Sequence, residues 1–375
     1  MPIKLCRKCV NPSTRPNALF DEEGVCLVCK FEDQKRSAQI DWQARQQELD
    51  EIIQWGKRNS KTSYDCIVTV SGGKDSTKQA MYARDELGLK PLLVSCVYPP
   101  EQLHERGANN LANLIALGFD TVSISLNPQV WKKMMRQAFL LYANWCRSTE
   151  MALYAIPIHV AIAYKIPLVF LGENPALTIG ENHGRLDGDA SRMKYSNTLG
   201  GGVPDKLMGE GVSRQDVHFY TYPPDDDMEY ADLRIIYMGY YIKEWSGRNN
   251  ADFAIQHGLQ TRHEPPEKIG DLWGVSSLDE DFRLVNQMLK YLKFGFGHVT
   301  DQVCDAINLG TMTREEGIEL IKKYDGKCDY VYIKRFCDYL EICEDKFWEV
   351  AESVRNRGVW CKDGDGEWCL DADYI

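Results

Sequence analysis

Two short cysteine pairs open the chain. Cys6 and Cys9 form one C-x-x-C pair, Cys26 and Cys29 form another, and sixteen residues separate the pairs. Four thiolates at this spacing are typical of a structural zinc site, in which each pair aims two sulfurs at one ion. A segment this short buries little core, so metal binding would supply its folding free energy. The spacing predicts a closed zinc ribbon; four unrelated surface thiols are the alternative.

A second motif, "TVSGGKDST" at residues 69–77, follows an apolar run and precedes a helical pattern. Backbone N–H groups and the positive end of a helix dipole favour an anion at such a place. The glycines allow close approach, the serines can donate hydrogen bonds and the lysine can neutralise phosphate. Asp75 could cap the helix or hold Mg²⁺. A phosphate site and a plain tight turn both remain open for Ser71, Gly72, Gly73, Lys74, Asp75 and Ser76.

The elements that must position these residues follow a regular order. Apolar runs of strand length alternate with helical patterns, which predicts a parallel sheet with flanking helices and right-handed crossovers. The expected strands are 64–70, 90–98, 120–126 and 166–174. We expect one helix over 31–60, helical structure over 128–165 with a break at Pro157, and a long loop over 175–215. The chain after about residue 226 has a mainly helical pattern.

Composition limits the class of protein. The chain has 375 residues, a net charge of −11 and thirteen cysteines. An acidic chain repels the phosphate backbone, so a protein that grips long nucleic acid is disfavoured. No apolar run is long enough for a membrane span. The N-terminus has no apolar stretch of signal-peptide length, which predicts a cytoplasmic protein. Its thiols would then stay reduced, and clustered cysteines would serve metal binding or catalysis rather than disulfides.

The segment "SGGKDS" closely resembles the pyrophosphate loop of the N-type ATP pyrophosphatases, the PP-loop superfamily. The resemblance implies an adenine nucleotide alpha hydrolase-like fold. It also implies that ATP is cleaved to AMP and pyrophosphate to adenylate a carbonyl oxygen, with Lys74 and Asp75 as catalytic residues. ATP would contact the loop, Ser95 and Gly172. Glu173 and Asn174 match a strand-end motif of relatives and would contact Mg²⁺ or substrate, with a structural turn as the alternative.

The whole chain resembles the N-acetyl sugar amidotransferases of bacterial surface-polysaccharide synthesis. The matching segments are the cysteine ribbon, the pyrophosphate loop, "LGENPA", "YYIKEW", "YLKFGFGHVTDQ" and "TREEGIELIKKYDG". The family implies conversion of an acetamido group to acetamidino on a nucleotide sugar, either of the UDP-2,3-diacetamido-mannuronate type or a nine-carbon ulosonic acid. It further implies substrate contacts by Lys293, His298, Asp301 and Arg314, although relatives carry Arg where His298 stands. Lys293 and Arg314 could instead be surface residues.

The same resemblance implies partners. Ammonia would come from a separate glutaminase through a channelling, cyclase-like subunit, both similar to subunits of imidazole-glycerol-phosphate synthase. The expected domains are a zinc ribbon at 1–35, an ATP pyrophosphatase domain at 36–225 and a helical substrate-binding region at 226–375.

Two other functions remain open. The ribbon and the pyrophosphate loop also occur together in tRNA thiolases, but the acidic charge and a lone Cys146 disfavour a thiolase. The second is a zinc module that binds AMP without catalysis.

Overall fold

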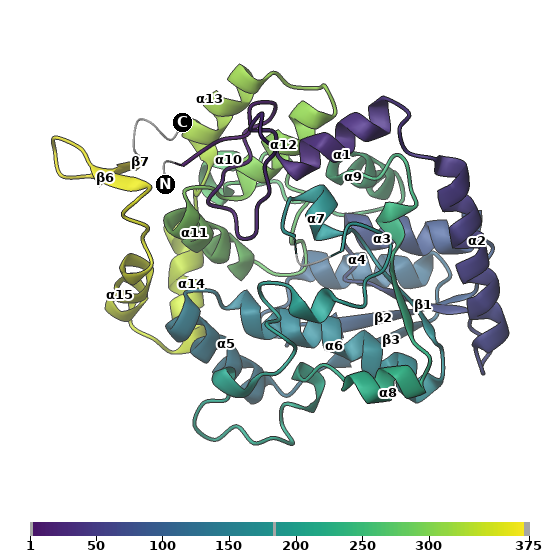
Figure 1. The fold of residues 1–375 in the computed structure, drawn as a ribbon. Helices are drawn as coiled ribbons and strands as arrows, with labels where there is room; N and C mark the ends of the chain where they lie inside the picture. The colour runs from purple at the N-terminus through teal and green to yellow at the C-terminus, as the bar shows by residue number, and fades with distance from the viewer. Residues whose placement is uncertain (1–2, 183–184, 371–375) are drawn as a thin grey trace.

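The computed structural model describes residues 3–182 and 185–370, and a five-stranded parallel sheet lies at its centre (Figure 1). The strand order is β3-β2-β1-β4-β5, and each neighbouring pair is parallel. The strands are β1 (Cys66–Thr69), β2 (Pro91–Val97), β3 (Thr121–Ser125), β4 (Leu168–Leu171) and β5 (Arg234–Tyr237). The predicted parallel sheet with flanking helices is confirmed, and so are its four predicted strands.

Both faces of the sheet are buried, because side chains alternate along each strand. Val169 and Leu171 of β4 pack into one apolar cluster, and Leu168 and Phe170 pack into another. The first cluster contains α5 (Pro128–Tyr142) and α6 (Cys146–Tyr164), and the second contains α2 (Trp42–Asn59), α3 (Lys74–Met81) and α4 (Glu105–Ala116). The molecule therefore has three layers at this point, with helices on both sides of the sheet.

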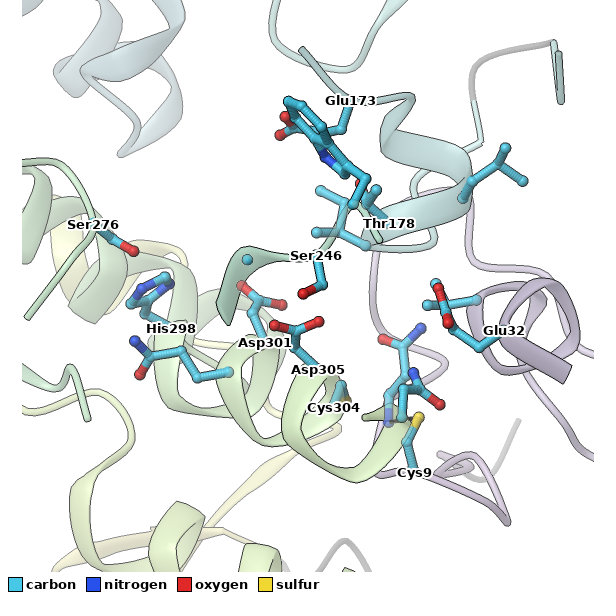
Figure 2. A pocket seen from close by; sticks show the side chains of 18 of the residues that line it. Cys9, Glu32, Glu173, Thr178, Ser246, Ser276, His298, Asp301, Cys304 and Asp305 are labelled. Atoms are coloured by element: carbon cyan, nitrogen blue, oxygen red, sulfur yellow. Dashed lines mark hydrogen bonds between the residues drawn. The ribbon is translucent and has the colours of Figure 1, made fainter. Parts of the chain in front are cut away.

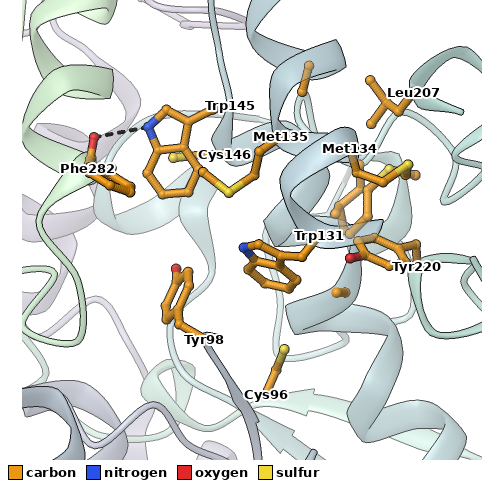
Figure 3. Close-up of a cluster of buried hydrophobic side chains, with 14 of the residues drawn as sticks. Cys96, Tyr98, Trp131, Met134, Met135, Trp145, Cys146, Leu207, Tyr220 and Phe282 are labelled. Carbon is orange, nitrogen blue, oxygen red and sulfur yellow. Dashed lines mark hydrogen bonds between the residues drawn. The ribbon is translucent and has the colours of Figure 1, made fainter. Parts of the chain in front are cut away.

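Large aromatic side chains fix the first layer (Figure 3). Trp131 of α5 is 1% exposed, and its ring meets that of Tyr98 edge-on with a centroid distance of 5.5 Å. Trp145, which precedes α6, donates a hydrogen bond from Nε1 to the carbonyl oxygen of Phe282 at 3.0 Å. This bond links the helical layer of α5 and α6 to α11 (Phe282–Phe294) of the C-terminal region.

Strand β5 was not expected. Residues 230–245 have a helical pattern, yet residues 234–237 pair in parallel with β4, from Leu168↔Arg234 to Leu171↔Tyr237. The helix prediction is wrong here because burial beside β4 outweighs local preference. The preceding α8 (Asp225–Tyr230) is a single short helix.

Two helix predictions need correction. The single helix expected over 31–60 is two helices, α1 (Leu27–Arg36) and α2, and Asp41 begins the second by accepting a hydrogen bond from Ala44 N at 2.9 Å. Pro157 does not break its helix, since α6 continues through it. The interruption comes earlier, at Ala143, which has a left-handed φ of +44°.

The C-terminal region is helical, as expected. Thr313 and Glu316 form the predicted capping box at the start of α13, and Gly326 follows its end with a φ of +71°. A small antiparallel hairpin follows the last helix. The other α-helices and strands are α7 (Pro175–Thr178), α9 (Gly247–Gln256), α10 (Pro266–Ile269), α12 (His298–Asn308), α13 (Arg314–Tyr324), α14 (Tyr330–Leu340), α15 (Glu344–Ser353), β6 (Trp360–Lys362) and β7 (Trp368–Leu370). Within the described ranges, every helix is too short or too polar to cross a lipid bilayer.

Candidate functional site

The glycine loop, residues 71–73, joins β1 to α3. It lies at the point in the strand order where β2 and β3 extend to one side of β1, and β4 and β5 extend to the other. β1 pairs with β2 on one side and with β4 on the other, and ligands of open α/β sheets bind outside the carboxyl ends of strands at such a point. Gly72 has a φ of +84°, and a Cβ there would lie 2.8 Å from the Leu111 nitrogen of α4. The first-turn N–H groups of α3 lack intrahelical acceptors, so the loop has the geometry of an anion site.

Lys74 and Asp75 form an ion pair at the start of α3. Lys74 Nζ lies 2.6 Å from Asp75 Oδ2, and Asn250 Nδ2 of α9 donates to Asp75 Oδ1 at 2.8 Å. The residue that caps α3 is Gly73, without a side-chain bond, and Asp75 lies in the first turn. Of the two roles considered for Asp75, its observed bonds to Lys74 and Asn250 are not those of a helix cap. Burial acts to lower the pKa of Lys74, but the Asp75 carboxylate outweighs it and the pKa is raised.

The end of β4 lies beside this loop, because Ile67 and Val68 of β1 pair with Val169 and Phe170. The Glu173 side chain is enclosed there, and burial together with the nearby Asp75 charge raises its pKa.

The side chain of Asn174 bonds to the backbone of the segment that follows β4. Its Oδ1 accepts from Ala176 N at 3.0 Å, and its Nδ2 donates to the carbonyl oxygens of Arg185 and Asp187 at 3.1 and 3.0 Å. These bonds are those of a strand-end turn, the alternative considered for this residue.

A cavity of about 490 Å³ opens in front of the glycine loop. Its size is in the range of small-molecule sites. The six residues predicted to bind phosphate, 71–76, all line it. Glu173, Cys146 and part of the 175–215 loop line it as well, and α11 forms the opposite wall. Ser95 and Gly172 are not among the residues that line this cavity or the smaller one beside it; Ser95 is buried within β2 at 2% exposure. We call this space the main cavity.

Three of the four predicted substrate residues meet in the main cavity. Lys293 Nζ donates to the carbonyl oxygens of Tyr142 and Ala143, the second at 3.2 Å. Burial, with a contribution from Arg147, lowers the pKa of Lys293 to about 8.

The other two lie on the first turn of α12. His298 Nε2 is 3.8 Å from Asp271 Oδ2. Asp301 accepts from Lys290 Nζ at 2.7 Å and from Arg15. Burial acts to raise the pKa of Asp301, yet Arg15 and Lys290 reverse this and hold it below the usual range.

Arg314 lies elsewhere. Its Nε donates to the carbonyl oxygen of Cys9 at 3.1 Å, and it is not among the residues lining either cavity. The contact links α13 to the N-terminal cysteine segment, so its geometry is that of a structural residue.

A side cavity of about 150 Å³ adjoins the main one and shares Lys74, Asp75 and Glu173 with it. Figure 2 shows Asp301 and Asp305 projecting from α12 toward Ser246. Asp305 Oδ2 accepts from Arg248 N at 3.1 Å, and burial raises the pKa of Asp305 to about 6.

The four N-terminal cysteines come together as predicted. Their sulfurs lie within 4.8 Å of one another, with 3.8 Å between Cys6 and Cys29 and 3.7 Å between Cys9 and Cys26. A tetrahedral ion with Zn–S bonds of about 2.3 Å would set such separations at about 3.8 Å. A four-iron cluster holds its thiolates farther apart, because each binds a different iron. The residues therefore fit one tetrahedral ion.

The cysteine segment packs on α12 and on the turn before it, and Figure 1 shows it beside α12 and α13. Cys29 Sγ lies 3.2 Å from Asn308 Oδ1, and Thr14 Oγ1 donates to the Phe294 carbonyl oxygen at 2.6 Å. Arg15, whose Nε donates to Asn11 Oδ1 at 2.7 Å, reaches Asp301 in the cavity. The ribbon is therefore part of the cavity wall.

Cys146 lines the main cavity but is 2% exposed. Arg283 Nη1 donates to its sulfur and to Glu150 Oε1, both at 3.0 Å. Burial raises the pKa of the Cys146 thiol despite the opposing arginine. A protonated, buried thiol is a poor nucleophile.

Sequence reasoning missed Arg15, Asp305 and the polar face of α11 apart from Lys293. The α11 face has a detectable signal, because polar residues recur at helical spacing between 283 and 293. Arg15 and Asp305 have no such signal, since neither belongs to a spaced motif.

Comparison with known proteins gives a family match for part of the chain. Residues 276–371 match the family model described as LPS biosynthesis protein WbpG-like, C-terminal domain. A search of curated proteins found no match. One similar solved structure is the U34-tRNA thiolase NcsA from Methanococcus maripaludis with its [4Fe-4S] cluster, at 12% identity and a TM-score of 0.31, over 86% of this chain and 89% of that chain.

The family match covers α11 to α15, so the wall of the main cavity opposite the glycine loop belongs to a region similar to a domain of lipopolysaccharide-biosynthesis proteins. This agrees with the family resemblance of the sequence. The TM-score of the thiolase comparison is too low to carry information on shared chemistry.

Proposed function

We propose that the protein is an ATP-dependent amidotransferase that converts an acetamido group of a nucleotide-activated sugar to an acetamidino group in lipopolysaccharide synthesis. One observation carries the proposal: a single cavity joins the glycine loop, which has the geometry of an anion site, to the wall formed by the region with the lipopolysaccharide-biosynthesis match. ATP phosphates would occupy the first side and the sugar the second.

The reaction balances as two displacements. The acetamido oxygen attacks the α-phosphorus of ATP, and pyrophosphate leaves with the bridging oxygen. The lone pair of ammonia then attacks the adenylated carbon, AMP leaves with the acetamido oxygen, and a proton from the nitrogen passes to a base. The chain's contribution is placement and charge neutralisation, which the loop amides and Lys74 can supply.

Mg²⁺ fits beside the loop, because Asp75 and Glu173 face the same cavity. Magnesium in ATP sites uses one or two carboxylates and phosphate oxygens, and two are present here. When bound, the ion would offset phosphate charge. In the same proposal, the four cysteines hold a structural Zn²⁺, and ammonia comes from a separate glutaminase through a cyclase-like channelling subunit.

The test supplies purified protein with ATP, Mg²⁺, ammonium and a UDP-diacetamidohexuronate. We expect pyrophosphate release that depends on the sugar, and a product whose mass falls by the difference between O and NH. Release without any change in the sugar, across a panel that includes nine-carbon ulosonic acids, would contradict the proposal.

The competing tRNA thiolase predicts tight tRNA binding that weakens steeply with salt. Filter binding of total tRNA at several salt concentrations separates the two functions. We expect weak binding, since the chain is acidic.

A further inference from the structure

The C-terminal hairpin places two thiols directly opposite one another. Strands β6 and β7 pair in antiparallel fashion, and Cys361 is the ladder partner of Cys369, with their sulfurs 3.5 Å apart. Directly opposed residues of an antiparallel pair have Cα atoms about 4.5 or 5.5 Å apart. Disulfides span Cα separations of about 4.4–6.8 Å. A small rotation of the two side chains would therefore bring the sulfurs to bonding distance.

The turn of the hairpin fixes this register. Asp363 Oδ1 accepts hydrogen bonds from Asp365 N at 3.0 Å and from Glu367 N at 2.9 Å. Asp363 N donates to the carbonyl oxygen of Glu367 at 2.9 Å, and Gly366 provides the left-handed φ of +85° that the turn requires. A slip of one residue would move every side chain to the other face. These bonds oppose such a slip, so the two cysteines remain partners.

The opposite face of the hairpin anchors it to the molecule. Trp360 is 7% exposed and meets Tyr291 of α11 edge-on, with a centroid distance of 5.0 Å. Trp368 packs against the same apolar cluster. Because side chains alternate along a strand, Cys361 and Cys369 lie on the other face. Cys361 is exposed and Cys369 is half-buried, and Figure 1 shows the hairpin at the edge of the molecule, where a solute can reach it.

We propose that Cys361 and Cys369 form an oxidation site, which reacts with a low-molecular-weight disulfide such as oxidised glutathione and closes into a cross-strand disulfide. Neither residue lines the main cavity or the side cavity, so the site is separate from the proposed ATP chemistry.

The exchange balances in two steps. The thiolate of Cys361, the more exposed of the two, attacks one sulfur of the small disulfide; the small S–S bond breaks, and one small thiolate leaves and takes up the proton that Cys361 lost. Cys369 then loses its proton, and its thiolate attacks the Cys361 sulfur and displaces the second small thiol. Two protein thiols are oxidised to one disulfide, and the small disulfide is reduced to two thiols.

Mass spectrometry of the full chain tests the site. The protein is equilibrated with mixtures of reduced and oxidised glutathione, the remaining thiols are alkylated, and the digest is read peptide by peptide. We expect a peptide that joins Cys361 to Cys369. This peptide should be at least about 10-fold more abundant than glutathione-bound Cys343, since the second step is intramolecular only in the hairpin. Cys343 is an exposed thiol on another element and is the internal comparison.

Two variants separate the roles of the thiols. Cys369→Ser should leave Cys361 as a stable mixed disulfide with glutathione, because the thiol that resolves it is gone. Cys343→Ser is the matched control and should leave the hairpin disulfide at its wild-type level.

Three results would overturn the proposal. The first is that both hairpin cysteines of the wild type remain as mixed disulfides without closing. The second is that they react no further than Cys343 at every glutathione ratio. The third is a disulfide between two chains in place of one within the hairpin, which a non-reducing gel distinguishes by mass.

Discussion

The charge on Lys74 is held in place by its neighbour. Asp75 contacts both this lysine and Asn250, so one carboxylate links the glycine loop to α9. Two carboxylate oxygens with defined partners orient the first turn of α3 toward the main cavity. At the residue scale, the phosphate binding proposed for the loop therefore depends on this carboxylate.

Replacing Asp75 with Asn should reduce pyrophosphate release by at least about 100-fold, because one preorganised charged group in such a site commonly contributes about 3 kcal/mol. Zinc content, measured on the same sample by elemental analysis, should not change. Asp252→Asn, an exposed change on α9, is the control. Full turnover by the Asp75 variant would show that the loop does not hold the phosphates as proposed.

The pKa of Asp305, raised to about 6 from its usual 3.8, predicts a pH-dependent stability. A carboxyl group with a raised folded-state pKa stabilises the fold below its unfolded pKa, and this contribution is lost as pH rises through about 6. Asp305→Asn should therefore be more stable than wild type by about 1–3 kcal/mol at pH 8. The difference should disappear near pH 4.

Urea denaturation of both proteins across this pH range measures the effect. Asp338→Asn, at an exposed pair with Lys334 on α14, serves as the control. A stability difference that does not vary with pH would count against a buried, destabilised Asp305 charge.

At the scale of elements, the two loop glycines differ in whether their position tolerates a side chain. A Cβ on Gly72 would meet the backbone of Leu111 and Asn110 in α4, and its φ of +84° is strained for other residues. Gly73 has an ordinary φ of −78°, and a Cβ there would meet Ser71 Oγ at 3.4 Å. The contact with α4 thus sets the path of the loop at one position only.

Gly72→Ala should lower the free energy of unfolding by about 1–3 kcal/mol and impair ATP binding, because α4 cannot move without displacing the sheet layer. Gly73→Ala is its matched partner and should change stability by less than about 1 kcal/mol. Denaturation and nucleotide binding measure both. Equal losses in the two variants would show that the Leu111 contact does not decide the loop's path.

The sequence predicted those elements whose pattern lies within a few neighbouring residues. The strand, loop and helix around Gly72 could be predicted because a turn glycine and apolar runs lie next to one another in the sequence. Strand β5 could not, because four residues, 234–237, take their conformation from pairing with β4. The contact of Arg15 with Asp301 was equally hidden, since it joins residues 286 positions apart. Long-range packing, which leaves no spacing in the sequence, decides both.

At the scale of the whole molecule, the N-terminal cysteine segment and helices α12 and α13 build one wall. The cysteine segment contacts α12 through Cys29, α13 through Cys9 and the cavity through Arg15. A metal ion held by the four cysteines would therefore support residues that face the proposed sugar site. Helix α11 and the glycine loop belong to different segments, and the ribbon closes the space beside them.

Cys26→Ser should release the metal and weaken sugar-nucleotide binding by about 10-fold or more, because Arg15 then loses its support and a charge-assisted contact is worth about 1.5–3 kcal/mol. ATP binding at the glycine loop should change much less. Cys328→Ser, a cysteine outside the cluster, is the control. Loss of metal with unchanged sugar affinity would show that the ribbon does not support the cavity.

The ribbon also has a consequence for synthesis on the ribosome. Its residues leave the ribosome before the residues they pack against, because Thr14 and Cys29 contact partners 280 and 279 positions later. Those partners are absent until the intervening residues have been translated. An ion captured early by the nascent cysteines could keep this segment folded during the wait, so the cell's metal supply would set the yield of finished protein as well as its stability.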